Sequence, residues 1–98
     1  MYLEVISPEA VLFSSNVDAI TVPGTEGEFQ LLNNHAPIVS SLKRGKIKIR
    51  VDSFQTLDLD LLHRQVAHTK KEDNKILSIP ILSGIIEMKN NKAVILID

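Results

Sequence analysis

Short apolar runs alternate with turn-forming residues along most of the chain. The runs are rich in β-branched residues and are bounded by Pro, Gly, Asn or Ser, which is typical of β-strands. Many short strands in such a rhythm indicate a β-sandwich or a β-barrel. We predict an all-β protein, a two-sheet, mainly antiparallel β-sandwich of about eight to ten short strands. The predicted strands cover residues 2–6, 10–13, 17–22, 27–32, 37–42, 46–51, 76–82, 85–88 and 93–97.

Residues 46–51, Lys-Ile-Lys-Ile-Arg-Val, show the clearest period of two. Their β-branched side chains fall on one face and their three cations on the other, so this strand has one dry and one wet face. Asn90 and Asn91 separate the last two apolar runs and predict a hairpin turn. Residues 7–9, Ser-Pro-Glu, suit the start of a helix, but the run that follows is too short for one, and we predict a turn.

Residues 52–75 break this rhythm. Leucines alternate with aspartates over residues 57–61, which fits a further strand, while residues 61–68 fit one or two helical turns equally well. Residues 69–75 are polar and charged and predict an exposed loop. If residues 57–62 form a strand, Asp58 and Asp60 lie opposite Lys48 and Arg50 in a hairpin, as cross-strand pairs of opposite charge.

Composition then narrows the class of protein. The chain has 98 residues, enough for a single domain. It has no cysteine, so a disulfide, a thiolate nucleophile and a cysteine-based zinc site are excluded. Aromatic residues make up 4% of the chain and the net charge is -1, which argues against a nucleic-acid-binding surface. The N-terminus lacks the basic and apolar regions of a secretory signal, and no apolar run approaches the ~18 residues that span a bilayer.

No residue pattern points to chemistry. Residues 24–27 have a Gly-x-x-Gly outline but lack the Lys and Ser or Thr of a phosphate loop. His35, His63 and His68 do not have the spacing of metal ligands. No Gly-x-Ser-x-Gly nucleophile motif is present. We therefore predict no catalytic, cofactor-binding or metal-binding residues.

One combination of motifs is specific to a known family. Residues 22–29, Val-Pro-Gly-Thr-Glu-Gly-Glu-Phe, followed by Asn-His-Ala-Pro at 34–37, resemble the signature of the epsilon subunit of F-type ATP synthases. The flanking segments are similar to the family as well, in the same order and at close to the same distances. The resemblance covers about residues 2–51 and 76–98, with supporting motifs at 3–9, 12–14, 42–49 and 83–98.

The chain departs from the family in three places. Residues 52–75 are longer than the usual connection there. Ser83 and Gly84 stand where the family often has two glycines. The sequence stops at Asp98, whereas epsilon subunits commonly continue into a helical hairpin. We expect residues 1–98 to form a single epsilon-type domain, a short form that neither binds ATP nor inhibits the motor with a C-terminal helix.

The resemblance implies a non-catalytic subunit of the central stalk, the rotor of ATP synthase. It would link the gamma subunit to the c-ring and couple ion translocation to ATP synthesis or hydrolysis, with no cofactor and no nucleic acid. It would be peripheral at the cytoplasmic face of the bacterial inner membrane and reach the membrane only through the c-ring. One alternative is a stand-alone small β-sandwich or barrel that binds a ligand or acts as an enzyme, and this function needs an enclosed polar site. Another alternative is a secreted binding module, which needs an export signal.

The resemblance also suggests which residues meet the partners. We expect Glu26, Glu28, Asn34 and His35 to form the end of the sandwich that contacts the c-ring and gamma. The flanking glycines allow a sharp turn that projects the two acids outward; the alternative is a solvated turn with a structural role alone. The family pairing further places residues 46–51 beside residues 76–81, in competition with the Asp58 and Asp60 hairpin.

Overall fold

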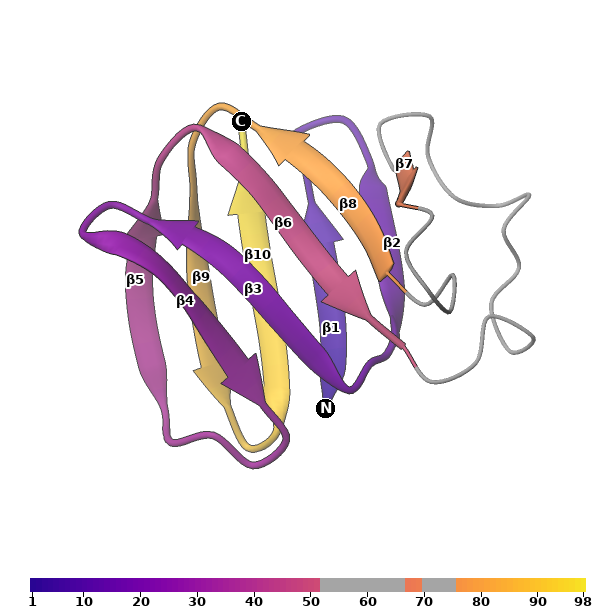
Figure 1. Cartoon of the computed structure of the whole chain (residues 1–98), viewed down its shortest axis with the longest axis vertical. Helices are drawn as coiled ribbons and strands as arrows, with labels where there is room; N and C mark the ends of the chain where they lie inside the picture. The colour runs from indigo at the N-terminus through magenta and orange to yellow at the C-terminus, as the bar shows by residue number, and fades with distance from the viewer. Residues whose placement is uncertain (52–66, 70–75) are drawn as a thin grey trace.

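The computed structural model describes residues 1–51, 67–69 and 76–98 (Figure 1). This part of the chain is built from short strands and contains no helix. Each of the nine runs predicted as a strand forms one, with ends that shift by only a few residues. The strands are β1 Tyr2–Ile6, β2 Val11–Asn16, β3 Ala19–Gly24, β4 Gly27–Leu32, β5 Ile38–Leu42, β6 Gly45–Arg50, β7 Ala67–Thr69, β8 Ile76–Ile81, β9 Gly84–Lys89 and β10 Lys92–Ile97.

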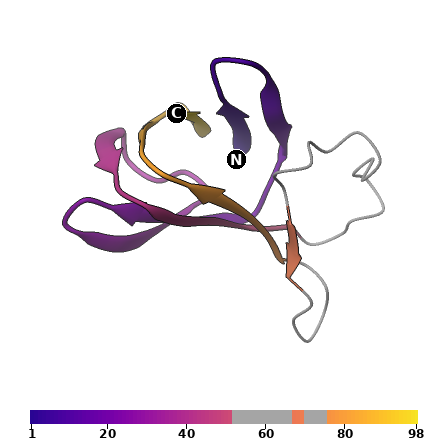
Figure 2. The same ribbon diagram turned by 90° about the horizontal axis from the view of Figure 1, so that it is seen from above.

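The strands follow one continuous path that curls into two facing layers (Figures 1 and 2). The order along the path is β2-β1-β10-β9-β5-β3-β6-β8-β7, and β4 pairs with the free edge of β3. One layer runs from β2 to β5 and the other from β4 to β7, and they are joined where β5 pairs with β3. Only β1 and β10 pair in parallel among the described strands. The predicted two-sheet, mainly antiparallel β-sandwich is therefore confirmed.

The hydrophobic core fills the space between the two layers, because alternate side chains of each strand point inward. In β6, Ile47 and Ile49 are fully buried and the intervening cations are exposed, as the period of two predicted. Burial of one such side chain contributes about 1.5–3 kcal/mol. The largest fully buried side chains are Phe13, Leu3, Ile20, Leu31, Ile47, Ile49, Leu77, Ile79, Ile86, Met88, Ile95 and Val5.

β6 lies between β3 and β8, with Lys48 opposite both Thr21 and Ser78. The pairing implied by the family, residues 46–51 beside 76–81, is confirmed. The hairpin that would place Asp58 and Asp60 opposite the cations of β6 is wrong, because both edges of β6 at these positions are already paired. Residues 57–62 themselves lie outside the described residues. Residues 67–69 form β7, which pairs with the other edge of β8.

The predicted hairpin between the last two strands is confirmed. Lys89 and Lys92 pair directly, and Asn90 and Asn91 form the two-residue loop between them. Both asparagines have positive φ, 52° and 58°, which is the backbone of a type I′ turn. Asparagine tolerates this left-handed region better than most residues.

Candidate functional site

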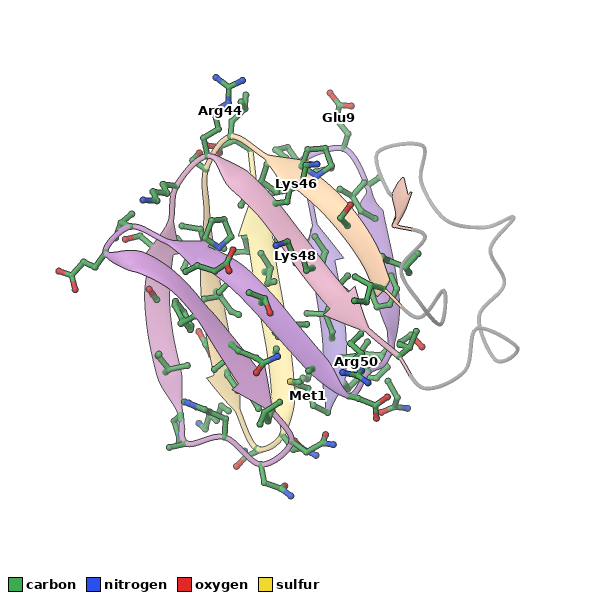
Figure 3. All side chains as sticks on the ribbon, viewed as in Figure 1. Met1, Glu9, Arg44, Lys46, Lys48 and Arg50 are labelled. Atoms are coloured by element: carbon green, nitrogen blue, oxygen red, sulfur yellow. The ribbon has the colours of Figure 1, made fainter. Side chains whose placement is uncertain are left out.

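The connections between strands gather at two opposite ends of the sandwich (Figure 3). The Glu26 end contains residues 7–10, 25–26, 43–44 and 82–83 together with Asp98. The Asn34 end contains Met1 and residues 33–37 and 90–91. Figure 3 shows Glu9 and Arg44 at the first of these ends and Met1 at the second. Loops at the ends of a rigid scaffold are the usual place for contacts with partners.

Glu26 lies in a tight turn between β3 and β4. Gly24 and Gly27 pair across this hairpin, so that residues 25–26 form its loop. Gly27 has a φ of 137°, which residues with a side chain rarely adopt. The backbone N–H of Thr25 donates to the carbonyl of Ser41 at 3.1 Å and ties the turn to β5. The Glu26 side chain is exposed, so the turn projects the carboxylate outward as expected.

Glu28 is the second residue of β4 and is also exposed. Its Oε2 lies 4.0 Å from Nζ of Lys48 on β6, and their side chains are 58% and 44% exposed. An ion pair this long and this exposed contributes little to stability. The carboxylate therefore lies over the outer face of the β4-β3-β6-β8 layer and remains available to a partner.

Asn34 and His35 lie at the other end of β4 from Glu26. The register of the β3-β4 hairpin places Leu32 opposite Ala19, five positions along from the Gly24 and Gly27 pair. The expectation that all four residues form one end of the sandwich is therefore wrong. The intervening residues are an extended strand, which advances ~3.3 Å per residue. Glu26 is separated from Asn34 and His35 by the length of β4, and Glu28 lies within that strand near its Glu26 end. The role of all four as contacts stays a prediction.

The Asn34 end is held together by hydrogen bonds between its turns. Asn34 has a φ of 63°, and its backbone N–H donates to Oδ1 of Asn91 at 2.8 Å. The N-terminal ammonium of Met1 donates to the carbonyl of Val17 at 3.3 Å and to Oδ1 of Asn33. His35 is exposed, and its backbone N–H donates to the carbonyl of Leu32 at 3.2 Å. Asn34 thus has a structural role in addition to any contact it makes.

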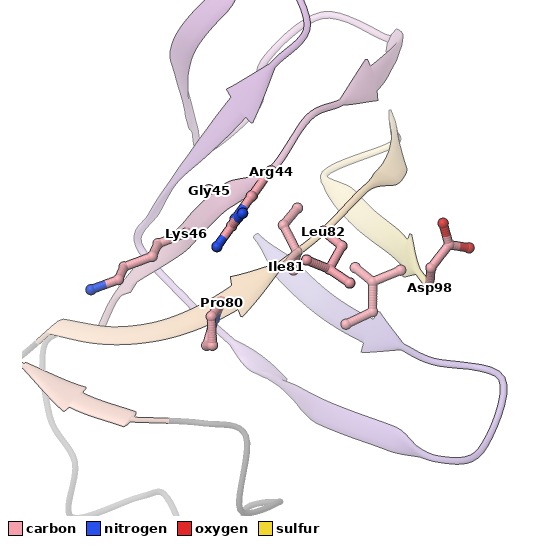
Figure 4. Close-up of a pocket in the computed structure, with 8 residues that line it drawn as sticks. Arg44, Gly45, Lys46, Pro80, Ile81, Leu82 and Asp98 are labelled. Carbon is pink, nitrogen blue, oxygen red and sulfur yellow. The ribbon is translucent and has the colours of Figure 1, made fainter.

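A cavity of about 410 Å³ opens at the Glu26 end (Figure 4). Arg44 and Lys46 lie on one side of it, the aliphatic side chains of Ile81 and Leu82 lie in the middle, and Asp98 lies on the far side, where its carboxylate accepts a hydrogen bond from Ser83 Oγ. Sequence reasoning missed this cavity, because its walls come from three separate parts of the chain. The lining residues are Arg44, Gly45, Lys46, Pro80, Ile81, Leu82, Ile97 and Asp98.

The described residues contain no cluster of three or more His, Asp or Glu side chains that would hold a metal ion. No helix long and apolar enough to cross a membrane occurs in the same residues. The outer face of the β4-β3-β6-β8 layer presents both signs of charge, with Glu28 on β4 and Lys46, Lys48 and Arg50 on β6 all exposed.

Comparison with known proteins gives the site a context. Residues 1–57, which contain β1 to β6, match the family model of the beta-sandwich domain of the ATP synthase delta/epsilon chain. The chain is 35% identical over 96 residues to the ATP synthase epsilon chain of Leptospira borgpetersenii serovar Hardjo-bovis (strain JB197), and 38% identical over 96 residues to that of Leptospira interrogans serovar copenhageni (strain Fiocruz L1-130). Each alignment covers 98% of this chain and 59% of the relative, so the chain spans well under two thirds of their length.

Solved structures share the fold. A chain in the central stalk and c-ring structure of the Tetrahymena thermophila mitochondrial ATP synthase superposes with a TM-score of 0.68 at 14% identity, covering 98% of this chain and 61% of that one. A chain of the Euglena gracilis mitochondrial ATP synthase gives the same TM-score at 18% identity, covering 97% and 48%. At these identities the likeness shows the β-sandwich alone.

Proposed function

Because the chain belongs to the ATP synthase delta/epsilon family, we propose that it is a non-catalytic subunit of the central stalk of an F-type ATP synthase. The observation that carries this proposal is the family match over residues 1–57. The matched residues contain strands β1 to β6. They also contain both regions that the sequence predicts as partner contacts. The epsilon chains of the two Leptospira species, which align with nearly the whole of this chain, support the same function.

In this role the domain is a rigid joint between the gamma subunit and the c-ring. The strands are cross-linked by hydrogen bonds along one continuous path, and a core of aliphatic side chains packs the two layers together. Torque transmission needs such stiffness, since a compliant joint would absorb rotation of the ring. The domain then couples ion translocation to ATP synthesis or hydrolysis without binding ATP or a cofactor itself.

The geometry sets a condition on the contacts. Glu26 and His35 lie at opposite ends of β4, so a partner that touches both must lie along the β3-β4 hairpin, or two partners must contact the ends separately. A subunit clasped between gamma and the c-ring satisfies the second arrangement. The domain would sit at the cytoplasmic face of the bacterial inner membrane and reach the membrane only through the c-ring.

Reconstitution tests the proposal directly. The purified chain is mixed with the gamma subunit and the detergent-solubilised c-ring of the same organism, and complexes are isolated by size exclusion. We expect the chain to co-elute with gamma and with the gamma–ring assembly, in one copy per assembly. A chain that elutes alone in every mixture would contradict the rotor function.

The cavity at the Glu26 end supports one alternative, a stand-alone protein that binds a small ligand. A melting-temperature screen against anionic and amphiphilic small molecules separates the two functions. A ligand-dependent shift together with no binding to gamma supports the ligand-binding protein, whereas binding to gamma with no shift supports the stalk subunit.

A further inference from the structure

The outer face of β6 carries a line of cations, which we call the β6 cationic row: Lys46, Lys48 and Arg50 (Figure 3). All three side chains are exposed, and Arg44 extends the row beyond the start of the strand. Alternate residues of a strand are ~6.6 Å apart on the same face, at a rise of ~3.3 Å per residue. The row is therefore a regular array of positive charge along one strand.

The residues directly opposite the row on β3 and β8 carry no charge. Lys48 lies opposite Thr21 on β3 and Ser78 on β8, and Lys46 lies opposite Pro80. Arg50 is flanked in the same way by an alanine and an isoleucine of these strands. Among the described residues the row has one ion pair, the 4.0 Å contact of Lys48 with Glu28. Like charges this close repel each other when no counter-charge lies beside them.

We propose that the β6 cationic row is a docking surface for an acidic segment of a protein partner. The inference rests on the proposed function, because it adds to the loop contacts a second surface through which the stalk holds this domain. Carboxylates at every second residue of a strand, or one helical turn apart, repeat at about 5–7 Å and match the spacing of the row. Such complementary charges set the orientation and the rate of docking.

The surroundings of the row favour a protein over a lipid surface or a nucleic acid. The outer-face neighbours of the cations on β3 and β8 include no aromatic side chain that would insert into a membrane or stack on a base. Glu28 and Glu26 lie on the neighbouring β3-β4 hairpin, and their carboxylates would be repelled by a uniformly anionic surface that covered the row and the hairpin together. A protein segment can place its acids against the cations alone.

The cavity at the Glu26 end adds a second element to this surface. Lys46 and Pro80, a directly opposed pair, both line the cavity, so the row leads to its opening (Figure 4). Leu82 in the lining is 69% exposed. A partner segment with an aliphatic side chain next to its acids would fill the cavity while the acids lie on the row.

A matched pair of double variants tests the proposal. Lys46→Gln with Lys48→Gln removes two charges from the row and the ion pair of Lys48 with Glu28. Lys89→Gln with Lys92→Gln removes two charges from the outer face of the other layer and the 3.1 Å ion pair of Lys92 with Glu4, so each double variant loses two charges and one ion pair. Affinity for the gamma–ring assembly is measured at low and high salt for both variants and the unaltered chain. We expect the row variant to bind roughly tenfold more weakly at low salt with a flatter salt dependence, and the control to bind nearly as the unaltered chain does.

The outcomes separate the two proposals. If the unaltered chain binds and the row variant binds equally well with the same salt dependence, the docking surface is refuted and the stalk function stands. If the unaltered chain does not bind at all, both proposals fail. Phosphatidylglycerol vesicles provide a further arm: row-dependent co-sedimentation with unchanged binding to the assembly would identify lipid as the occupant and overturn the protein partner. Melting temperatures show whether each variant folds, and Arg50→Gln alone replaces the double variant if it does not.

Discussion

Gly24 of β3 lies directly opposite Leu42 of β5, and this pair is where the two layers of the sandwich join. Two backbone hydrogen bonds flank it, from Thr25 N–H to the Ser41 carbonyl at 3.1 Å and from Lys43 N–H to the Pro23 carbonyl at 2.8 Å. On its other side Gly24 pairs with Gly27 of β4. A Cβ at Gly24 would lie 2.7 Å from the carbonyl oxygen of Gly27, so β4 can lie this close only because Gly24 has no side chain.

Gly24→Ala should therefore destabilise the domain. The added methyl group would also meet the ring of Phe29 at 2.7 Å, so both backbone and side chain must shift, at a cost of about 1–3 kcal/mol. Urea unfolding measures the loss as a lower midpoint. Glu26→Ala, at an exposed position two residues away, is the control and should change stability by no more than about 0.5 kcal/mol. Equal midpoints for the two variants would show that the junction tolerates a side chain.

The turn between β9 and β10 makes a second prediction. Asn90 has a φ of 52°, a conformation that glycine adopts freely and β-branched residues resist. Asn90→Gly should leave the melting temperature nearly unchanged, while Asn90→Val should destabilise the domain by about 1–2 kcal/mol. Thermal unfolding followed by circular dichroism compares them. A valine variant as stable as the glycine variant would argue against the left-handed turn.

The sequence predicts the strands well because each strand carries its own evidence. In β6 the alternation of Ile47 and Ile49 with cations already specifies which face is buried. Which strands lie side by side is a different matter, because pairing joins residues far apart in the chain. Charge alternation alone suggested Asp58 and Asp60 as neighbours of β6, whereas the family resemblance correctly indicated β8.

The local shape of the candidate site could be predicted from the sequence, but which of its residues lie together could not. The glycines around Glu26 predicted an exposed turn, and the structure has one. The family resemblance also suggested that Glu26 and His35 share an end, but an extended strand lies between them. The cavity brings Arg44, Leu82 and Asp98 together, and no local pattern marks residues that meet only through the fold.

Glu28 offers a test that separates a contact from a structural role. Its ion pair with Lys48 is long and exposed, so Glu28→Lys should shift stability by less than about 1 kcal/mol. If the carboxylate meets a partner, the same variant should bind the gamma–ring assembly more weakly at an unchanged melting temperature. Unchanged binding would exclude Glu28 as a contact. Loss of both stability and binding would support the structural alternative instead.

The separation of Glu26 and His35 leads to the last prediction, which concerns additivity. Both residues are exposed, and β4 lies between them with six residues, about 20 Å of extended chain. Substitutions more than about 7–10 Å apart usually add in free energy. If both residues are contacts, Glu26→Lys and His35→Ala should each weaken binding to the gamma–ring assembly, and the double variant should lose the sum of the two effects.

A double-mutant cycle measures this directly from four dissociation constants. Glu87→Lys, on the exposed outer face of β9 in the other layer, serves as the control and should leave binding unchanged. A coupling free energy above about 0.5 kcal/mol between Glu26 and His35 would mean that the two ends do not act independently. Each end would then bind only once the other is seated, and gamma and the c-ring would have to engage this domain as a single preassembled surface. Additive losses fit two partners that contact opposite ends of one rigid hairpin.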